Sequence, residues 1–191
     1  MIASRLAVCG LLGVSLAAAG CIQISRYPRS WPPLETVDGN TCAVIAGTFA
    51  GTAQTEPPSE PRMSPNLGSV FDIYGATAVM IVQPGDDAIE VTVLSQFGRD
   101  LHAGTRRTLS RAAGDFECAA DGIALRPWKG VDRYYGAVVW GRNRVTLRKS
   151  ADGALIVRQA PSGIGLVMMV PFVFVGRAWY RYTPFVLDSP R

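Results

Sequence analysis

In this 191-residue chain, Cys42 and Cys118 are the two residues best suited to covalent chemistry with each other. If the chain folds in an oxidising compartment, we expect these two thiols to form a disulfide. The bond would close a loop of about 75 residues, which in the chain-entropy model stabilises the fold by about 4 kcal/mol. The alternative is a pair of buried, unpaired thiols that act as small apolar side chains.

The only histidine, His102, is the second residue with catalytic or metal-binding potential. A zinc site would need carboxylates and thiols around it, and a nucleophilic Cys118 activated by His102 would have to stay reduced. No G-x-S-x-G, H-E-x-x-H, P-loop or G-x-G-x-x-G pattern accompanies them. We therefore predict no catalytic residue, metal or cofactor, and a protein that is not an enzyme.

Positive charge is concentrated in the second half of the chain. Residues 21–98 carry 3 basic and 8 acidic residues, whereas residues 99–181 carry 14 basic and 6 acidic residues. Four side chains at even spacing would line one face of a straight strand: Trp140, Arg142, Arg144 and Arg148. Val145 and Leu147 would then point inward. This face is a candidate binding surface for an anionic partner. The alternative is an ordinary solvated strand face.

The first 20 residues have the three parts of a secretory signal. Arg5 gives positive charge, residues 6–16 are apolar except for one serine, and residues 17–20 are small. The string LAAAGC that ends at Cys21 resembles a bacterial lipobox, although such sites usually carry leucine where this chain has Ala18. The alternative is cleavage by the ordinary signal peptidase after Ala19, which would leave three cysteines in the mature chain.

The resemblance to bacterial lipoproteins implies that Cys21 receives diacylglycerol and becomes the first residue of the mature protein. It also implies a membrane anchor made of acyl chains, and Ile22 in place of aspartate resembles sorting to the outer membrane, facing the periplasm. The mature chain then keeps one cysteine pair, Cys42 and Cys118.

The mature chain divides by composition. Residues 21–41 are proline-rich and predict a semi-stiff tether, and residues 42–191 predict a single β-rich domain. Strand patterns cover residues 42–50, 69–74, 77–82 and 88–97. Two Asp-Gly pairs, Asp121-Gly122 and Asp152-Gly153, predict β-hairpins. A short helix over residues 105–113 is also considered, with Thr105 as its cap.

Residues 160–176 are uncharged over 17 positions. Glycines, Pro171 and β-branched residues favour two buried strands joined near Pro171 over a membrane span. A third interpretation is an exposed apolar lip around a ligand cavity.

Taken together, the sequence predicts an all-β protein, an antiparallel barrel or sandwich of about eight to ten short strands. The predicted function is a lipid-anchored envelope protein with a non-catalytic binding or structural domain. Its partner would be an anionic envelope component, such as lipopolysaccharide phosphates, or another envelope protein, at the basic strand face or the loop at 54–66. No nucleic acid is expected. The alternatives are a lipocalin-like carrier of an apolar ligand and, third, an envelope hydrolase.

Overall fold

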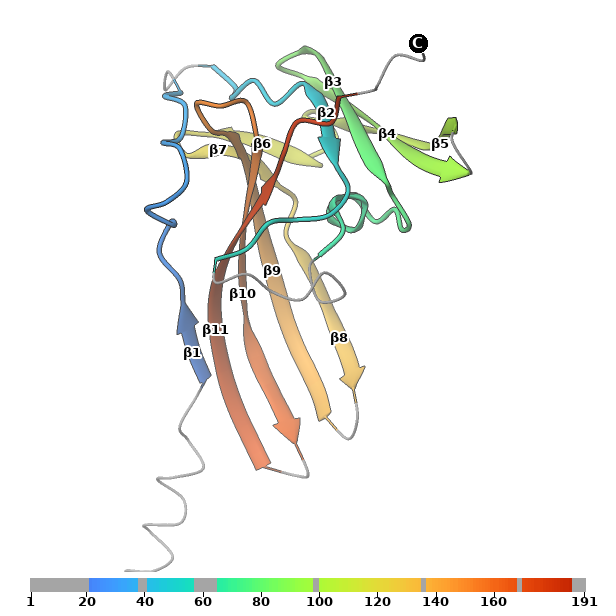
Figure 1. Cartoon of the computed structure of the whole chain (residues 1–191). Helices are drawn as coiled ribbons and strands as arrows, with labels where there is room; N and C mark the ends of the chain where they lie inside the picture. Colours follow the sequence, from blue (N-terminus) through green and yellow to red (C-terminus); the bar gives the residue numbers. More distant parts are fainter. Residues whose placement is uncertain are drawn as a thin grey trace, which may run out of the picture. The chain divides into compact units, whose positions relative to one another are not determined.

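The computed structural model describes residues 21–37, 41–56, 65–97, 100–134, 137–167 and 170–186. The predicted signal peptide and most of the 54–66 loop lie outside these residues. The described chain is all-β, as predicted, with eleven strands and one short 3-10 helix (Figure 1). The sheets do not close into a barrel.

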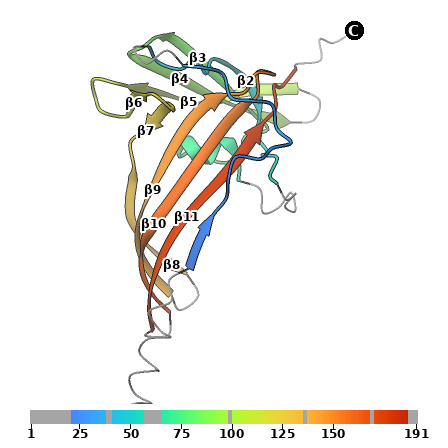
Figure 2. The ribbon, with the colours of Figure 1, turned by 90° about the vertical axis from the view of Figure 1, so that its left-hand side faces the viewer.

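Seven strands form the larger sheet. They are β1 (Cys21–Ile24), β6 (Phe116–Ala119), β7 (Gly122–Leu125), β8 (Trp128–Tyr134), β9 (Ala137–Lys149), β10 (Leu155–Val167) and β11 (Val170–Tyr182). The order is β1-β11-β10-β9-β7-β6, and β8 also pairs with β9. Strand β1 runs parallel to β11, whereas β6–β7, β7–β9 and β8–β9 pair antiparallel. Figure 2 shows β9, β10, β11 and β1 side by side.

The smaller sheet has four strands in the order β2-β3-β4-β5. They are β2 (Gly47–Ala50), β3 (Ala78–Gly85), β4 (Ala88–Phe97) and β5 (Asp100–Ser110), and each pairs antiparallel with its neighbour. Every strand of this sheet thus pairs with the strand that precedes or follows it in the chain.

The chain forms two compact units, each built from discontinuous segments. The ribbon unit consists of Met1–Ser25, Pro127–Arg144 and Gln159–Ala178. The sandwich unit consists of Arg26–Arg126, Val145–Arg158 and Trp179–Arg191. Each of the long strands β9, β10 and β11 contributes residues to both units.

The sandwich unit holds the hydrophobic core. Side chains of the smaller sheet, such as Ile81 and Val91, form one cluster with Leu147, Leu155 and Tyr182 of the larger sheet. Ile81 alternates along β3 with the exposed Met80 and Val82, which is the pattern of a sheet covered on one face, whereas the residues beside Leu155 are buried as well. Burial raises the pKa of Tyr182, the largest side chain of this core.

The structure joins Cys42 and Cys118 in a disulfide with their Cα atoms 4.9 Å apart. Cys42 precedes β2, and Cys118 lies on β6 of the first Asp-Gly hairpin. The bond therefore links the beginning of the domain to that hairpin, in agreement with the sequence prediction. Both Asp-Gly pairs lie where one strand leads into its neighbour in the sheet, β6 into β7 and β9 into β10, as the turn pattern predicts.

Three local predictions were wrong at least in part. The strand predicted over residues 42–50 begins only at Gly47. Residues 69–74 are not a strand, because Leu67–Phe71 forms the 3-10 helix η1, whose first turn is capped by the Asn66 side chain. Both Leu67 and Phe71 are buried in the core. Residues 105–113 are not a helix, because residues up to Ser110 belong to β5. Pairing with β4 satisfies the backbone of this segment, and that tertiary pairing outweighs its local propensity.

The segment predicted as a tether is partly docked in the structure. Residues 21–24 form β1 in the ribbon unit. In the sandwich unit, Leu34 bridges to Ser150, and the Glu35 amide donates to the Lys149 carbonyl at 3.0 Å. The described part of this proline-rich segment therefore contributes backbone hydrogen bonds to both units.

Candidate functional site

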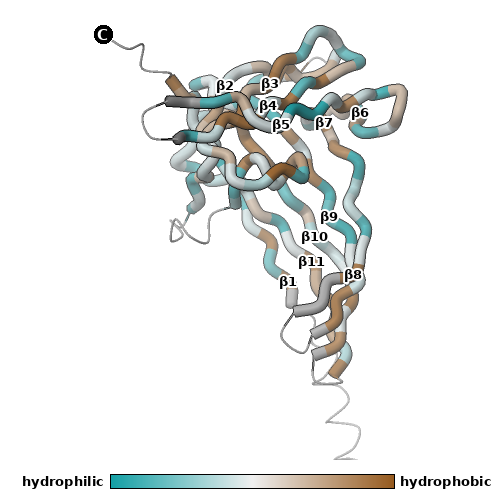
Figure 3. Tube along the Cα trace, turned by 90° about the vertical axis from the view of Figure 1, so that its right-hand side faces the viewer, coloured by the Kyte–Doolittle hydropathy of each residue, from teal (hydrophilic) through white to brown (hydrophobic). Residues whose placement is uncertain are grey.

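The ribbon unit is a single layer of five strands, and its two faces differ in chemistry. In this unit the order is β8-β9-β10-β11-β1. Side chains of one strand alternate between the two faces, so residues two positions apart share a face. Figure 3 shows hydrophobic segments in brown at the lower end of these strands, beside the β8 label.

One face, here named the aromatic face, carries phenylalanine rings over glycines. A Cβ added to Gly165 would meet the Phe172 ring at 2.5 Å, and one added to Gly163 would meet the Phe174 ring at 2.8 Å. The Phe174 ring also lies 3.2 Å from the Cβ position of Gly141 on β9. Because the rings occupy the space above these glycines, they are half-buried without a second layer of structure.

The opposite face of the ribbon unit is here named the exposed face. The same alternation along each strand identifies the side chains that lie on it. Ile164 lies between the two glycines of β10 and Val173 lies between the two phenylalanines of β11, so both point away from the aromatic face. Trp140 precedes Gly141 and shares the exposed face. Consistent with this assignment, the Arg142 Nε atom donates to the Ser162 Oγ atom at 3.4 Å, and Val131 is the register partner of Trp140.

Apolar side chains on the exposed face are open to solvent. Val131 is 50% exposed, Trp140 43%, Ile164 58% and Val173 52%. The prediction of two buried strands over residues 160–176 was therefore wrong about burial, although it was right about two strands. The strands meet between Val167 and Val170, near Pro171 as predicted. We name these four side chains the apolar row, since they come from four consecutive strands.

Basic side chains of the exposed face follow the apolar row along the strands. Lys129 and Arg142 are register partners on β8 and β9, and both are exposed. Arg144 and Arg177 are also exposed. Each lies four residues after the member of the apolar row on its own strand, Trp140 on β9 and Val173 on β11. The ion pairs found among the described side chains, Arg106–Glu90, Arg107–Asp72, Arg158–Asp121 and Arg181–Asp152, all lie in the sandwich unit.

The predicted binding residues divide between the units. Trp140, Arg142 and Arg144 lie in the ribbon unit on β9, whereas Arg148 lies in the sandwich unit. The Arg148 Nε atom donates to the Glu35 carbonyl at 2.9 Å. Its guanidinium is thus engaged with the docked segment, and the first three residues form the exposed part of the predicted surface.

Cys21, the residue predicted to be acylated, lies in the ribbon unit. It is the register partner of Phe174, and the next pair is Ile22 with Val175. Ile22 is 74% exposed and Ile24 is also exposed. Strand β1 therefore adds two isoleucines to the edge of the sheet, directly after the predicted acylation residue. The sequence pattern alone did not assign these isoleucines to any face.

The sandwich unit has its own candidate site, a small pocket of about 110 Å³. The residues that line it are Leu34, Asp121, Thr146, Arg148, Ile156, Arg158 and Trp179. Arg158 forms an ion pair with Asp121, donates to the Thr146 Oγ1 atom at 3.1 Å and lies 5.7 Å from the centre of the Trp179 ring. The cationic groups of this pocket are therefore engaged by protein partners. Sequence patterns did not indicate Arg158, because an isolated arginine carries no spacing signal.

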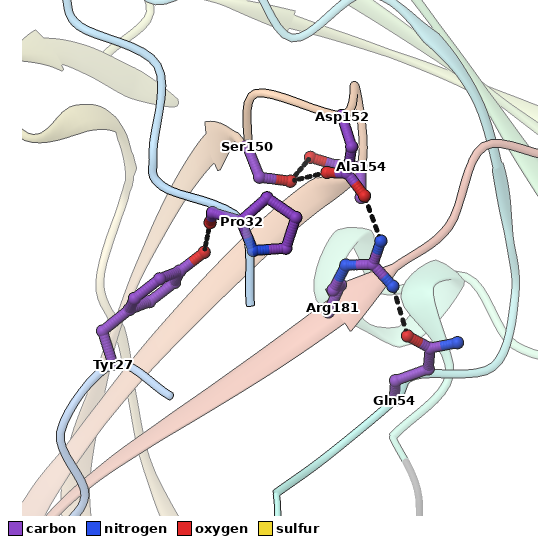
Figure 4. Close-up of polar contacts among 7 residues, drawn as sticks. All are labelled: Tyr27, Pro32, Gln54, Ser150, Asp152, Ala154 and Arg181. Atoms are coloured by element: carbon purple, nitrogen blue, oxygen red, sulfur yellow. Dashed lines mark hydrogen bonds and ion pairs between the residues drawn. The ribbon is translucent and has the colours of Figure 1, made fainter. Parts of the chain in front are cut away.

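Aromatic and polar contacts fasten the docked segment in the sandwich unit. The Tyr27 ring meets Trp31 and Trp179 edge-on at 5.8 and 5.3 Å, and its hydroxyl donates to the Pro32 carbonyl at 2.6 Å. Burial, with a smaller contribution from the Asp152 charge, raises the pKa of Tyr27. Figure 4 shows this contact beside those of Asp152.

Asp152 belongs to the second Asp-Gly turn and joins it to β11. Its carboxylate accepts from the Ser150 hydroxyl at 2.6 Å and pairs with Arg181, which also donates to the Gln54 side chain (Figure 4). The Ser150 hydrogen bond, followed by the Arg181 interactions, holds the pKa of Asp152 below its ordinary value. These contacts fix the turn and the end of β11, which is a structural role.

One of the two residues considered for catalysis takes part in the disulfide. Cys118 is in the disulfide, so it offers no thiolate to His102, which is exposed on β5. In the described ranges, no group of three or more His, Cys, Asp or Glu side chains is arranged to hold a metal ion. No helix among the described residues is long and apolar enough to cross a membrane.

Comparisons of the chain with protein-family models, with curated proteins and with solved structures found no match.

Proposed function

We propose that this chain is a lipid-anchored protein of the bacterial envelope whose β-structure presents a non-catalytic binding surface. The observation that carries the proposal is the position of Cys21 in the ribbon unit, beside β11 and next to the exposed Ile22. A lipobox-like string before this cysteine and exposed apolar side chains after it both fit an attachment to lipid. The disulfide between Cys42 and Cys118 fits an oxidising compartment such as the periplasm.

The binding surface in this proposal is the exposed face, with Trp140, Arg142 and Arg144 as the residues that the sequence and the fold both indicate. A solvent-open tryptophan beside exposed guanidinium groups is a combination that suits recognition of anionic partners. A lipocalin-like carrier would need an enclosed interior, and the two described sheets do not close around one. No observation on the described residues favours a hydrolase.

The intact mass of the protein from a membrane fraction, alkylated with and without prior reduction, tests the anchor. The expected mass is that of residues 21–191 plus acyl chains, two hydrogens short before reduction. The Cys21→Ser variant should lose the acyl mass and the membrane association that depends on it. A mass that starts at Gly20 without lipid would contradict the proposal and indicate a soluble exported protein.

A further inference from the structure

We infer that the exposed face of the ribbon unit is itself a membrane-contact surface, and that it binds the headgroup region of a bilayer containing anionic phospholipids. The inference deepens the proposed function, since it names the partner of the binding surface. It depends on side chains of the sheet and not on the acyl chains. The two claims can therefore fail separately.

The apolar row provides the first argument. Val131, Trp140, Ile164 and Val173 come from four strands that lie next to one another, and each is between 43% and 58% exposed. Single exposed apolar side chains are ordinary on a protein surface, but a continuous row across a sheet marks an interaction site. Tryptophan in such a row suits the interface between water and lipid, because its ring is apolar and its N–H group is polar.

The order of chemistry along the strands provides the second argument. Moving along β9 on the exposed face, Trp140 is followed by Arg142 and then by Arg144. On β11 the same direction passes from Val173 through Val175 to Arg177. The first level of this face is apolar, and its cations lie at the next two levels beside the exposed Val175, Ile22 and Ile24. Such an arrangement suits the boundary of a bilayer, where acyl chains meet phosphate groups.

Charge provides the third argument, because it selects the partner. From Cys21 onward, the sequence of the ribbon unit has five basic residues and a single acidic one, Asp132. Basic residues near a membrane surface are attracted to anionic lipids, and their effects add. A partner that is apolar at one level and negatively charged at the next is a phospholipid bilayer with anionic headgroups.

The position of the predicted anchor provides the fourth argument. The register pairs Cys21 with Phe174 and Ile22 with Val175, so Cys21 meets β11 between the levels of Val173 and Val175. The Cys21 backbone therefore lies at the level where the exposed face changes from the apolar row to the basic residues. An acyl anchor at this level of β1 would keep the ribbon unit close to a bilayer.

A vesicle flotation experiment tests the inference on the oxidised mature chain, residues 21–191, carrying Cys21→Ser so that no acyl chain contributes. The chain should float with vesicles of phosphatidylethanolamine and phosphatidylglycerol and should stay behind with phosphatidylcholine alone. Binding should weaken as the salt concentration rises, because screening reduces the attraction of the cations to the headgroups.

Two variants on the exposed face should weaken this binding. Arg142→Gln with Arg144→Gln should raise the dissociation constant about 25-fold, on the basis of about fivefold for each basic residue. Ile164→Asp with Val173→Asp should abolish flotation, because two carboxylates would enter the apolar level. Circular dichroism and thermal unfolding check that both variants keep the fold.

Matched changes in the sandwich unit serve as controls. Arg111→Gln with Arg126→Gln removes two exposed arginines, and Val82→Asp places a charge at an exposed apolar position of β3. These variants should bind vesicles like the Cys21→Ser chain. If they lose binding as strongly as the ribbon variants, the attraction is a property of the whole charged protein and the inference is wrong.

Trp140 supplies a measurement that needs no inserted charge. Brominated phospholipids should quench part of the tryptophan fluorescence when the Cys21→Ser chain is bound, and Trp140→Phe should remove most of that quenching. Quenching that is unchanged in Trp140→Phe would overturn the assignment of this face to the bilayer.

Three other results would also overturn the inference. One is a folded Cys21→Ser chain that ignores anionic vesicles. A second is self-association without vesicles that Ile164→Asp with Val173→Asp abolishes, which would assign the face to a second copy of the chain. A third is binding to lipopolysaccharide but not to phosphatidylglycerol vesicles. In each case the intact mass of the membrane-derived protein would still decide the anchor at Cys21 independently.

Discussion

The sandwich unit and the ribbon unit use similar strands in opposite ways. All the fully buried apolar side chains among the described residues, from Cys42 to Tyr182, belong to the sandwich unit. In the ribbon unit, apolar side chains of the exposed face are about half open to solvent. The difference arises because two sheets share one core in the sandwich unit, whereas the ribbon unit is one layer with two faces.

The comparison teaches that apolar composition does not by itself specify a core. The residues of β10 and β11 in the ribbon unit are as apolar as those of β3 and β4, but no second sheet of that unit covers them. On the aromatic face, phenylalanine rings pack over glycines and are half-buried. Its exposed face keeps a surface that a partner can cover.

Breaking the disulfide should cause the largest loss of stability, and both of its cysteines belong to the sandwich unit. Replacing Cys42 and Cys118 by alanine should lower the free energy of unfolding by about 4 kcal/mol, because the unfolded chain regains the freedom of a long loop. Thermal and denaturant unfolding of the variant measure the loss. Reduction of the unaltered protein should reproduce it, and a loss below about 1 kcal/mol would contradict the importance of this bond.

Truncating one isoleucine in each unit tests the comparison directly. Ile81→Ala should cost about 3 kcal/mol, because it leaves a cavity in the sandwich core where Ile81 is 1% exposed. Ile164→Ala should cost less than about 1 kcal/mol, because the side chain already lies in water. Denaturant unfolding of the two variants gives both values. Equal costs would mean that the ribbon face is covered in the isolated protein, and the comparison would fail.

The smallest loss of stability is expected for Asp152, whose carboxylate pairs with Arg181 of β11 in the sandwich unit. Its pKa is lowered in the folded state by Ser150 and then Arg181, so its stabilising contribution is present above its unfolded value of about 4 and is lost as the pH falls through the lowered folded value. Asp152→Asn should lower the free energy of unfolding by less than about 1 kcal/mol at neutral pH, because the pair is partly exposed.

The pH dependence distinguishes this electrostatic contribution from a packing effect. The difference between Asp152→Asn and the unaltered protein should shrink as the pH falls below about 4, when the carboxylate becomes protonated. Ser150→Ala should raise the pKa of Asp152, because it removes the first of the interactions that lower it. Carboxyl titration by nuclear magnetic resonance, together with unfolding at several pH values, measures both. A difference that stays constant with pH would contradict the electrostatic account.

The sequence by itself determined the features that depend on local chemistry or on a short spacing. Alternating apolar residues and Asp-Gly turns predicted an all-β chain and placed two hairpins, because turn geometry and strand alternation act over a few residues. The pairing of Cys42 with Cys118 followed from the small number of cysteines. The spacing of Trp140, Arg142 and Arg144 identified one side of β9, because side chains alternate strictly along a strand.

The tertiary structure decided what covers each strand. It placed residues 105–110 in a strand because β4 offers a hydrogen-bonding edge, and it turned residues 67–71 into a 3-10 helix that fills the core with Phe71. It left Ile164, Val173 and Val175 exposed. It also placed the Arg148 guanidinium against the Glu35 carbonyl of the docked segment. Burial depends on which distant segments pack together, and neither composition nor periodicity contains that information.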